Sequence, residues 1–135
     1  MNEEQVIRDA VAAWNEGGVD AFLERVSPGI EWRPPPGFPQ GDLWRGRDEL
    51  RRELHDQFGD IFEPGKVEVK SVDSALEGWL VAVRHSVQAQ SSGMDLWWDA
   101  WFVWTVEDGL ITRSLVFLNR AAAERAAGML KHAGD

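Results

Sequence analysis

One acidic side chain in an aromatic stretch is the first candidate for chemistry. Asp99 stands between Trp97 and Trp101, and because side chains alternate along a strand, all three are expected on one face. Indole rings that exclude water would raise the pKa of the Asp99 carboxyl, and a raised pKa suits a general acid or base. Arg84, on the strand expected before it, could instead neutralise Asp99 in a structural ion pair. The residues leave both interpretations of Asp99 open.

The element that positions Asp99 is predicted to be a β-hairpin of residues 94–106 and 110–119. Asp108-Gly109 separates the two apolar runs, and this dipeptide favours a type I′ turn, which needs a positive φ at both central residues. A two-residue loop there would pair Thr105 with Thr112 and define two faces. One face would carry Trp98, Phe102, Trp104, Arg113, Leu115 and Phe117, and the other Trp97, Asp99, Trp101, Val103, Ser114, Val116 and Leu118.

The strand before this hairpin is predicted at residues 79–90, and its register depends on the turn at residues 91–93. A two-residue loop at Ser92-Gly93 would place Ser86 opposite Asp99, whereas a three-residue loop would exchange the two faces of the strand. We favour the two-residue loop because it gathers the β-branched residues on one face. That face would hold Val81, Val83, Val87, Trp98, Phe102 and Trp104.

The opposite face combines aromatic rings with a few polar groups, which is typical of a ligand pocket. Its candidate catalytic residues are Asp99 and Arg84. Its candidate ligand-binding residues are Trp97, Trp101, Ser86, Ser114, Val116 and Leu118, with Trp14 from the first helix as the floor. His85 alternates onto the apolar face, where a core or interface histidine is expected. Because the three histidines are scattered and no glycine-rich phosphate loop is present, we predict no metal and no cofactor.

The remaining elements are helices followed by a sheet. Helices are predicted at residues 3–16, 19–26, 47–58 and 120–130, and further strands at 30–32 and 66–75. Residues 33–46 form a loop rich in proline and glycine that carries Phe38 and Trp44, and it is either a lid or a stiff cover over the core. This order indicates an α+β fold with a mostly antiparallel sheet, in a single domain of residues 1–135.

Composition excludes several classes of function. The 135 residues contain no cysteine, and 14 basic against 23 acidic residues give a net charge of −9, which disfavours binding to nucleic acid. No apolar run approaches the roughly 20 residues of a membrane span, and the N-terminal residues do not resemble a signal peptide. We therefore expect a soluble, cytoplasmic protein without a membrane or nucleic-acid partner.

Three segments carry a resemblance to a known family. They are AWNEGGVDAFLERVSPGIEW, WRGRDELRREL, and the stretch from SSGMDLWWDAWFVW to the last helix, and together they span nearly the whole chain. In this order they resemble the SnoaL-like group of the nuclear transport factor 2-like superfamily. The resemblance implies a cone-shaped fold, with three N-terminal helices packed on a strongly curved, mostly antiparallel sheet and a short C-terminal helix. It also implies an internal pocket and, often, a dimer.

The resemblance does not select one reaction, because this fold hosts isomerases, polyketide cyclases, epoxide hydrolases, dehydratases and binding proteins. The general base of ketosteroid isomerases corresponds to Arg33, and one of their two oxyanion-hole donors to Trp101. The other donor is a tyrosine, and this chain has none. Epoxide hydrolases of this fold pair two aspartates with an arginine, of which Arg84 and Asp99 could supply two. Cyclases of the SnoaL type use a sheet aspartate, for which Asp99 is the nearest match.

The sequence therefore predicts a domain that binds an apolar or aromatic small molecule in a tryptophan-lined cone. Acid/base catalysis through Asp99, of the cyclase, isomerase or hydrolase type, is the catalytic interpretation. The alternative is a non-catalytic ligand-binding or dimerisation module. We also predict a homodimer, because the sheet face of Val83, Trp98, Phe102, Trp104, Leu115 and Phe117 is too apolar for a monomer surface.

Overall fold

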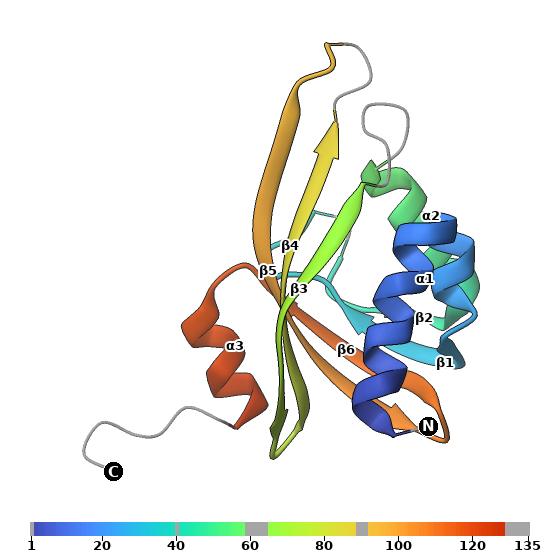
Figure 1. Ribbon diagram of the computed structural model, residues 1–135. Helices are drawn as coiled ribbons and strands as arrows, with labels where there is room; N and C mark the ends of the chain where they lie inside the picture. Colours follow the sequence, from blue (N-terminus) through green and yellow to red (C-terminus); the bar gives the residue numbers. More distant parts are fainter. Residues whose placement is uncertain (1, 40, 59–64, 89–91, 129–135) are drawn as a thin grey trace.

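A curved, open sheet separates two longer helices from a short one (Figure 1). This is seen in a computed structural model that describes residues 2–39, 41–58, 65–88 and 92–128. The elements follow in the order α1 (Glu3–Leu23), β1 (Val26–Arg33), β2 (Trp44–Arg45), α2 (Gly46–Phe58), β3 (Lys66–Ala75), β4 (Gly78–Gln88), β5 (Asp95–Glu107), β6 (Leu110–Phe117) and α3 (Arg120–Ala127). The strand order is β2-β1-β6-β5-β4-β3, and only β1 and β6 pair in parallel.

The N-terminal helical region differs from the prediction of three helices. The two segments predicted at residues 3–16 and 19–26 form α1, which is kinked where Gly18 adopts φ 77° and ψ −155°. A left-handed φ of this kind is accessible to glycine because it lacks a Cβ. The second segment ends at Leu23, three residues earlier than predicted, and Val26 already begins β1. Helix α3 ends at a left-handed Gly128, and Leu130 and His132 lie outside the described residues.

The predicted hairpin turn is confirmed, but the pairing beyond it is not. Asp108 and Gly109 both have positive φ, and Glu107 pairs with Leu110. A bulge between Thr105 and Val106 then pairs Thr105 with Arg113 instead of Thr112. A slip of one residue turns a whole strand over, because side chains alternate. Ser114, Val116 and Leu118 therefore share a face with Trp98, Phe102 and Trp104, not with Asp99.

The register between β4 and β5 also differs from the prediction, by two residues. Arg84, not Ser86, lies opposite Asp99, and Gln88 pairs with Asp95, so the connection is longer than the two-residue loop. Ser91 itself lies outside the described residues. A shift of two preserves alternation, and the valines of β4 do share a face with Trp98, Phe102 and Trp104 as predicted.

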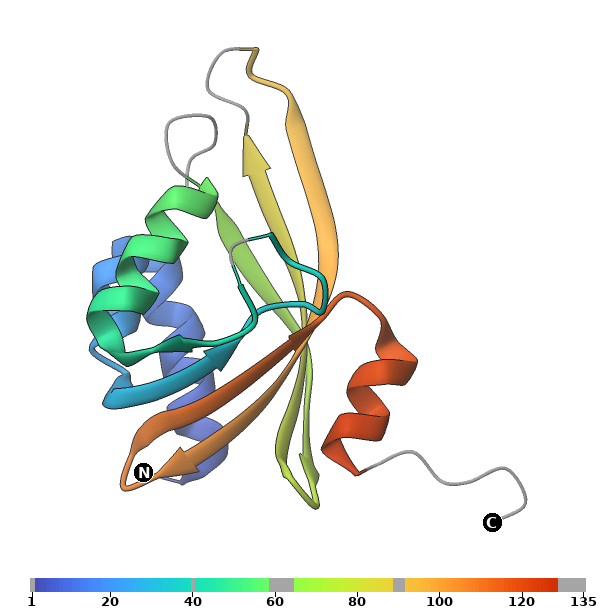
Figure 2. The same ribbon diagram turned by 180° about the vertical axis from the view of Figure 1, so that it is seen from behind.

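This valine and tryptophan face is the concave face of the sheet, turned toward α1 and α2 (Figures 1 and 2). Val83 is 2% exposed and Trp104 is 1% exposed, both within a single chain. The six residues predicted to form the dimer surface therefore do not lie on one surface. Its members Val83, Trp98, Phe102 and Trp104 pack inside the cone, whereas Leu115 and Phe117 lie on the convex face with α3. The physical reason is that two amphipathic helices bury their stripes on the most apolar face available.

Candidate functional site

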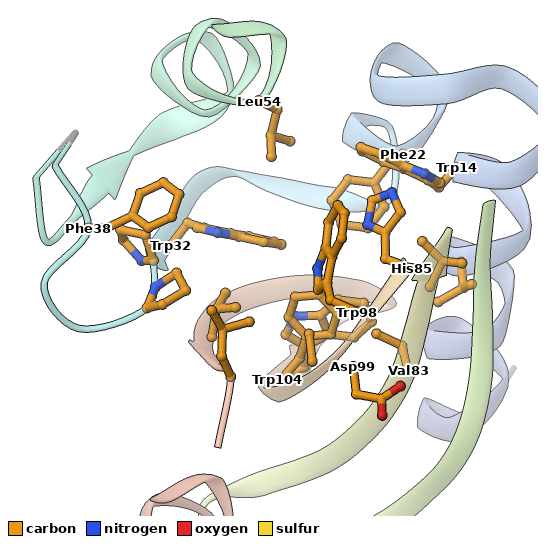
Figure 3. A pocket seen from close by; sticks show the side chains of 18 of the residues that line it. Trp14, Phe22, Trp32, Phe38, Leu54, Val83, His85, Trp98, Asp99 and Trp104 are labelled. Atoms are coloured by element: carbon orange, nitrogen blue, oxygen red, sulfur yellow. The ribbon is translucent and has the colours of Figure 1, made fainter. Parts of the chain in front are cut away.

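A cavity of about 440 Å³ lies between the helices and the concave face of the sheet (Figure 3). Most of its wall is aromatic or aliphatic. The aromatic members are Trp14, Phe22, Trp32, Phe38, Trp44, Trp98, Phe102 and Trp104. The others are Val11, Pro34, Pro35, Leu54, Val67, Val83, His85, Asp99, Ala100, Val116 and Leu118. A concave, apolar volume of this size fits a small organic molecule, since ligand pockets are roughly 300–1,000 Å³.

The rings of the wall are held by one another in several planes. Phe22 meets Trp14 edge to face at 5.9 Å and 82°, and it meets Trp32 at 6.0 Å and 90°. Phe102 stacks on Trp104 at 4.8 Å and 23°. Edge-to-face and offset-stacked pairs are the favoured arrangements of aromatic quadrupoles. The wall is therefore a preformed surface on which a flat apolar ligand can pack.

Two tethers hold the helices that contribute to this wall. Asn15 Nδ2 donates to the Val67 carbonyl at 2.9 Å, and the Val67 amide donates to Asn15 Oδ1 at 2.7 Å. This pair attaches α1 to the edge strand β3 next to Trp14. Arg47 Nε and Nη2 donate to the Val26 carbonyl at 3.0 and 2.6 Å, which ties α2 to β1. Each tether supplies hydrogen-bond partners for backbone groups of the strand that it holds.

A buried hydrogen bond explains why Ser114 is not part of the cavity surface. Trp104 Nε1 donates to Ser114 Oγ at 2.9 Å, and Ser114 is completely buried. The hydroxyl is on the concave side, but it supports the indole rather than facing the cavity volume. Of the predicted ligand-binding residues, the structure places Trp14, Val116 and Leu118 on the cavity wall.

His85 is the titratable side chain that sequence reasoning left out of the site. It is 8% exposed, and its imidazole lies 4.7 Å from the Trp98 ring centroid and 5.7 Å from that of Trp14. Figure 3 shows the imidazole among the rings of the cavity. Alternation correctly predicts that His85 lies on the apolar face of the sheet, but this face forms the wall of the cavity.

Asp99 and Arg84 form an ion pair on the convex face. Arg84 Nε donates to Asp99 Oδ1 at 2.9 Å, and Arg84 Nη2 donates to Asp99 Oδ2 at 3.3 Å. Each side chain is a little more than one-third exposed. Asp99 adjoins the cavity, but its carboxylate turns away from the rings (Figure 3). The hydrogen bond from Arg84 lowers the pKa of Asp99, and the hydrogen bond to Asp99 raises the pKa of Arg84. The expectation of a raised Asp99 pKa is therefore wrong, because a cation offsets the desolvation.

The other predicted ligand contacts also lie outside the cavity. Trp97 is 59% exposed, and the Arg84 guanidinium carbon lies 3.9 Å from its ring centroid. The Arg84 guanidinium therefore makes a cation–π contact with the exposed Trp97 ring. Trp101 packs against the cluster under α3, and Ser86 is exposed. The polar, aromatic face that was expected to be the pocket is the outside of the cone.

The loop rich in proline and glycine forms one end of the cavity wall. Pro34, Pro35 and Phe38 line the cavity, and the Phe38 amide donates to the Pro35 carbonyl at 3.1 Å. Phe38 also meets Trp44 at 6.2 Å, measured between ring centroids. Trp44 is buried in β2, a two-residue strand within the segment predicted as a loop. The loop covers the core, and its role as a moving lid stays a prediction.

The sequence does not predict most of the cavity wall, because it indicates the face of Asp99 as the pocket and the cavity lies on the other face. The amphipathic pattern of the two helices could have identified the wall. Helices α1 and α2 each need an apolar surface to pack on, and the most apolar face of the sheet holds Trp98, Phe102, Trp104 and the valines. Among the described residues, no cluster of three or more acidic, histidine or cysteine side chains could hold a metal ion. Within the same ranges, no helix combines the length and apolarity needed to cross a bilayer.

Solved structures share this architecture at low sequence identity. An NTF2-like protein from Burkholderia thailandensis is 23% identical, with a TM-score of 0.69 over 90% of this chain and 94% of its own. An NTF2-like protein from Burkholderia pseudomallei is 18% identical, with a TM-score of 0.73 over 94% and 98%. TerC, co-crystallised with polyporic acid, is 18% identical, with a TM-score of 0.71 over 90% and 95%. These similarities show a shared NTF2-like fold.

The sequence itself supplies the family. None of the curated proteins compared with it matches significantly. The profile of the SnoaL-like domain, in contrast, matches residues 7–114, which include most of α1, all of α2 and the sheet up to Ser114 in β6. The chain therefore belongs to the SnoaL-like domain family.

Proposed function

We propose that the cavity binds a small, flat, largely apolar molecule. The observation that supports this proposal is the wall of edge-to-face and stacked rings around a volume of about 440 Å³. TerC, which shares the fold, was co-crystallised with polyporic acid. We carry over from that protein only the idea that a small organic molecule occupies a domain of this shape.

For catalysis, we assign His85 rather than Asp99 as the residue that would exchange a proton with a ligand. The imidazole of His85 lies among the rings of the cavity wall, whereas the carboxylate of Asp99 is bound to Arg84 on the convex face. Cyclase, isomerase and hydrolase chemistry each need such a positioned acid or base. The second candidate is a binding module without turnover, favoured by the aromatic and aliphatic character of most of the cavity wall.

Filling the cavity from one wall tests the binding proposal. Ala100 lines the cavity from β5, and Ala82 is half-buried on the convex face of β4, opposite Trp101. A thermal-shift screen of flat aromatic compounds should give ligands that stabilise the wild type and quench its tryptophan fluorescence. Ala100→Phe should lose both effects, and Ala82→Phe should retain them. Equal binding by both variants would show that the ligand is elsewhere.

Replacing His85 separates an enzyme from a binding module. His85→Gln should retain binding of the best ligand from the screen, because most of the contact surface is aromatic. If the domain is an enzyme, turnover of that ligand, followed by mass spectrometry, should fall by about two to four orders of magnitude. Turnover that survives in His85→Gln would exclude His85 as the acid/base. No turnover by the wild type on any ligand of the screen would favour the binding module.

For assembly, we infer a homodimer formed through the convex face. Trp97 is mostly exposed there, and Trp101 and Phe117 are only partly covered by α3. Partly exposed large aromatic side chains grouped on one sheet face are typical of a protein–protein contact. This surface replaces the one expected from the sequence, because the original residues are divided between the two faces of the sheet.

A further inference from the structure

A second hollow lies on the convex side of the sheet, where α3 meets β5 and β6. Its volume is about 320 Å³. We call it the arginine groove, and its lining residues are Glu77, Val103, Thr105, Arg113, Leu115, Arg125, Ala126 and Gly128. Figures 1 and 2 show α3 on the opposite side of the sheet from α1 and α2, so this groove is separate from the aromatic cavity.

The floor and rim of the arginine groove are fixed by the fold. Val103 pairs with Leu115 and Thr105 pairs with Arg113 across β5 and β6, so apolar and polar residues lie side by side. The Glu77 amide donates to the Ala127 carbonyl at 3.1 Å, which ties the β3–β4 turn to the end of α3. A Cβ on Gly128 would lie 3.0 Å from Leu76 Cβ, so this junction is also closely packed.

The groove brings together two guanidinium groups that have no acidic partner among the described residues. Neither Arg113 nor Arg125 forms an ion pair within the described ranges, although the sequence has 23 acidic and 14 basic residues. Six other arginines in those ranges do form ion pairs: Arg8, Arg45, Arg51, Arg52, Arg84 and Arg120. Arg125 also opposes the negative end of α3, but Arg113 comes from β6 and has no such role.

The charges around the groove select the kind of anion. Two guanidinium groups and the Glu77 carboxylate give the lining a net charge of +1. Guanidinium groups bind carboxylates and phosphates through paired hydrogen bonds. A monoanion matches a net charge of +1, whereas the second charge of a phosphate would face Glu77. The apolar floor of Val103, Leu115 and Ala126 favours a ligand with a hydrocarbon part.

We propose that the arginine groove binds a small organic monocarboxylate, with the carboxylate between Arg113 and Arg125 and the apolar part on the floor. This site does not depend on the ligand of the aromatic cavity. It gives the domain a second binding site on the face that we assign to self-association, so its occupant would lie next to that contact.

A titration followed by nuclear magnetic resonance tests the site, with benzoate as the probe at low ionic strength. Benzoate should shift the backbone amides of Thr105, Ala126 and Gly128, and the neutral analogue benzyl alcohol should shift them much less. Phosphate should bind more weakly than benzoate. Because exposed charges are screened, raising the salt should weaken the binding of benzoate. A benzoate response confined to Ala100 and its neighbours would place the anion in the aromatic cavity and overturn the proposal.

Charge-removing variants show which side chains of the groove contribute to the binding of benzoate. Arg113→Gln and Arg125→Gln should each weaken benzoate binding by about tenfold or more. Arg25→Gln removes the same charge from an exposed arginine outside the groove and should leave the affinity unchanged. Glu77→Gln should narrow the preference for benzoate over phosphate. Equal affinities in Arg113→Gln and Arg25→Gln, with both proteins folded by circular dichroism, would show that the groove is not an anion site.

Discussion

Asp99 shows how far the partner of a single residue decides its chemistry. Flanking tryptophans indicated desolvation and a raised pKa, but Trp97 is largely exposed and Trp101 packs under α3. Arg84 then supplies a bidentate hydrogen bond that stabilises the ionised carboxylate. In contrast, His85 is expected from the sequence to be a core or interface histidine, but it lies on the wall of the cavity. At this scale, the position of each side chain decides its candidacy: His85 points into the cavity, whereas the carboxylate of Asp99 turns away from it.

Asp99→Asn should cause a small loss of stability at neutral pH, because exposed ion pairs contribute little. The pKa of Asp99 is lowered in the folded state, so the stabilisation is present above the unfolded pKa of about 3.9. It is lost as the pH falls through the lower folded value. Urea unfolding at pH 7 and about pH 2 should show a difference from the wild type only at the higher pH.

Arg84→Gln provides the matched control for this pair. It should cause a similar loss at pH 7, and the double variant should add little to either single change. A large loss for Asp99→Asn alone, or a loss that grows at low pH, would contradict the geometry of the pair.

Ser114→Ala should destabilise the protein by about 1–3 kcal/mol, because it leaves the buried Trp104 Nε1 without its acceptor. Ser86→Ala, on the exposed side of the neighbouring strand β4, should change stability by less than about 0.5 kcal/mol. Denaturant midpoints with unchanged slopes would measure both effects. Equal midpoints for the two variants would show that the indole finds another partner.

At the scale of elements, the hairpin β5–β6 decides which side chains face the cavity. The Asp108-Gly109 dipeptide predicts the turn, but no residue pattern predicts the bulge between Thr105 and Val106. A bulge inserts one residue without a sequence signature as strong as that of a type I′ turn. Because of it, Ser114, Val116 and Leu118 belong to the concave face. The helices then cover that face and complete the cavity.

Gly78 is a test of how tightly the sheet is packed near this bulge. Its φ is 124°, and a Cβ there would lie 2.4 Å from the carbonyl oxygen of Trp104. Gly78→Ala should therefore destabilise the protein by at least about 1–3 kcal/mol through strain and contact with the backbone. Gly29→Ala adds the same methyl group where nothing lies within 4 Å and should be close to neutral. Similar melting temperatures for both variants would contradict the packing at Gly78.

At the scale of the molecule, the two faces of the sheet are covered to different extents. The concave face and the helices enclose the aromatic cavity, and α3 covers only part of the convex face (Figure 2). The partly exposed aromatic side chains beyond α3 are the basis for the proposed homodimer. Ligand binding and assembly would then use opposite sides of one layer.

Two tryptophan substitutions distinguish the proposed dimer surface on the convex face from the surface that the sequence predicts. Trp97→Glu should leave the circular dichroism spectrum unchanged and shift the protein toward a monomer in sedimentation experiments, because Trp97 is exposed on the convex face. Trp104→Glu should unfold the protein instead, because it places a charge in the core. A wild type that sediments as a monomer at micromolar concentration would refute the dimer.

The sequence alone determined the kinds of elements and the family. The Asp-Gly turn, the alternation in β4 to β6 and the positions of most elements depend on local periodicity, and these features were correct within a few residues. The first two predicted helices form one kinked helix, however, and the short strand β2 was not predicted. The tertiary structure alone decided which face of the sheet is inside. Alternation divides side chains into two sets but does not say which set is buried, and a single bulge exchanges the sets along a strand. The helices settled that choice, since they pack on the more apolar face and leave Asp99 and Arg84 outside.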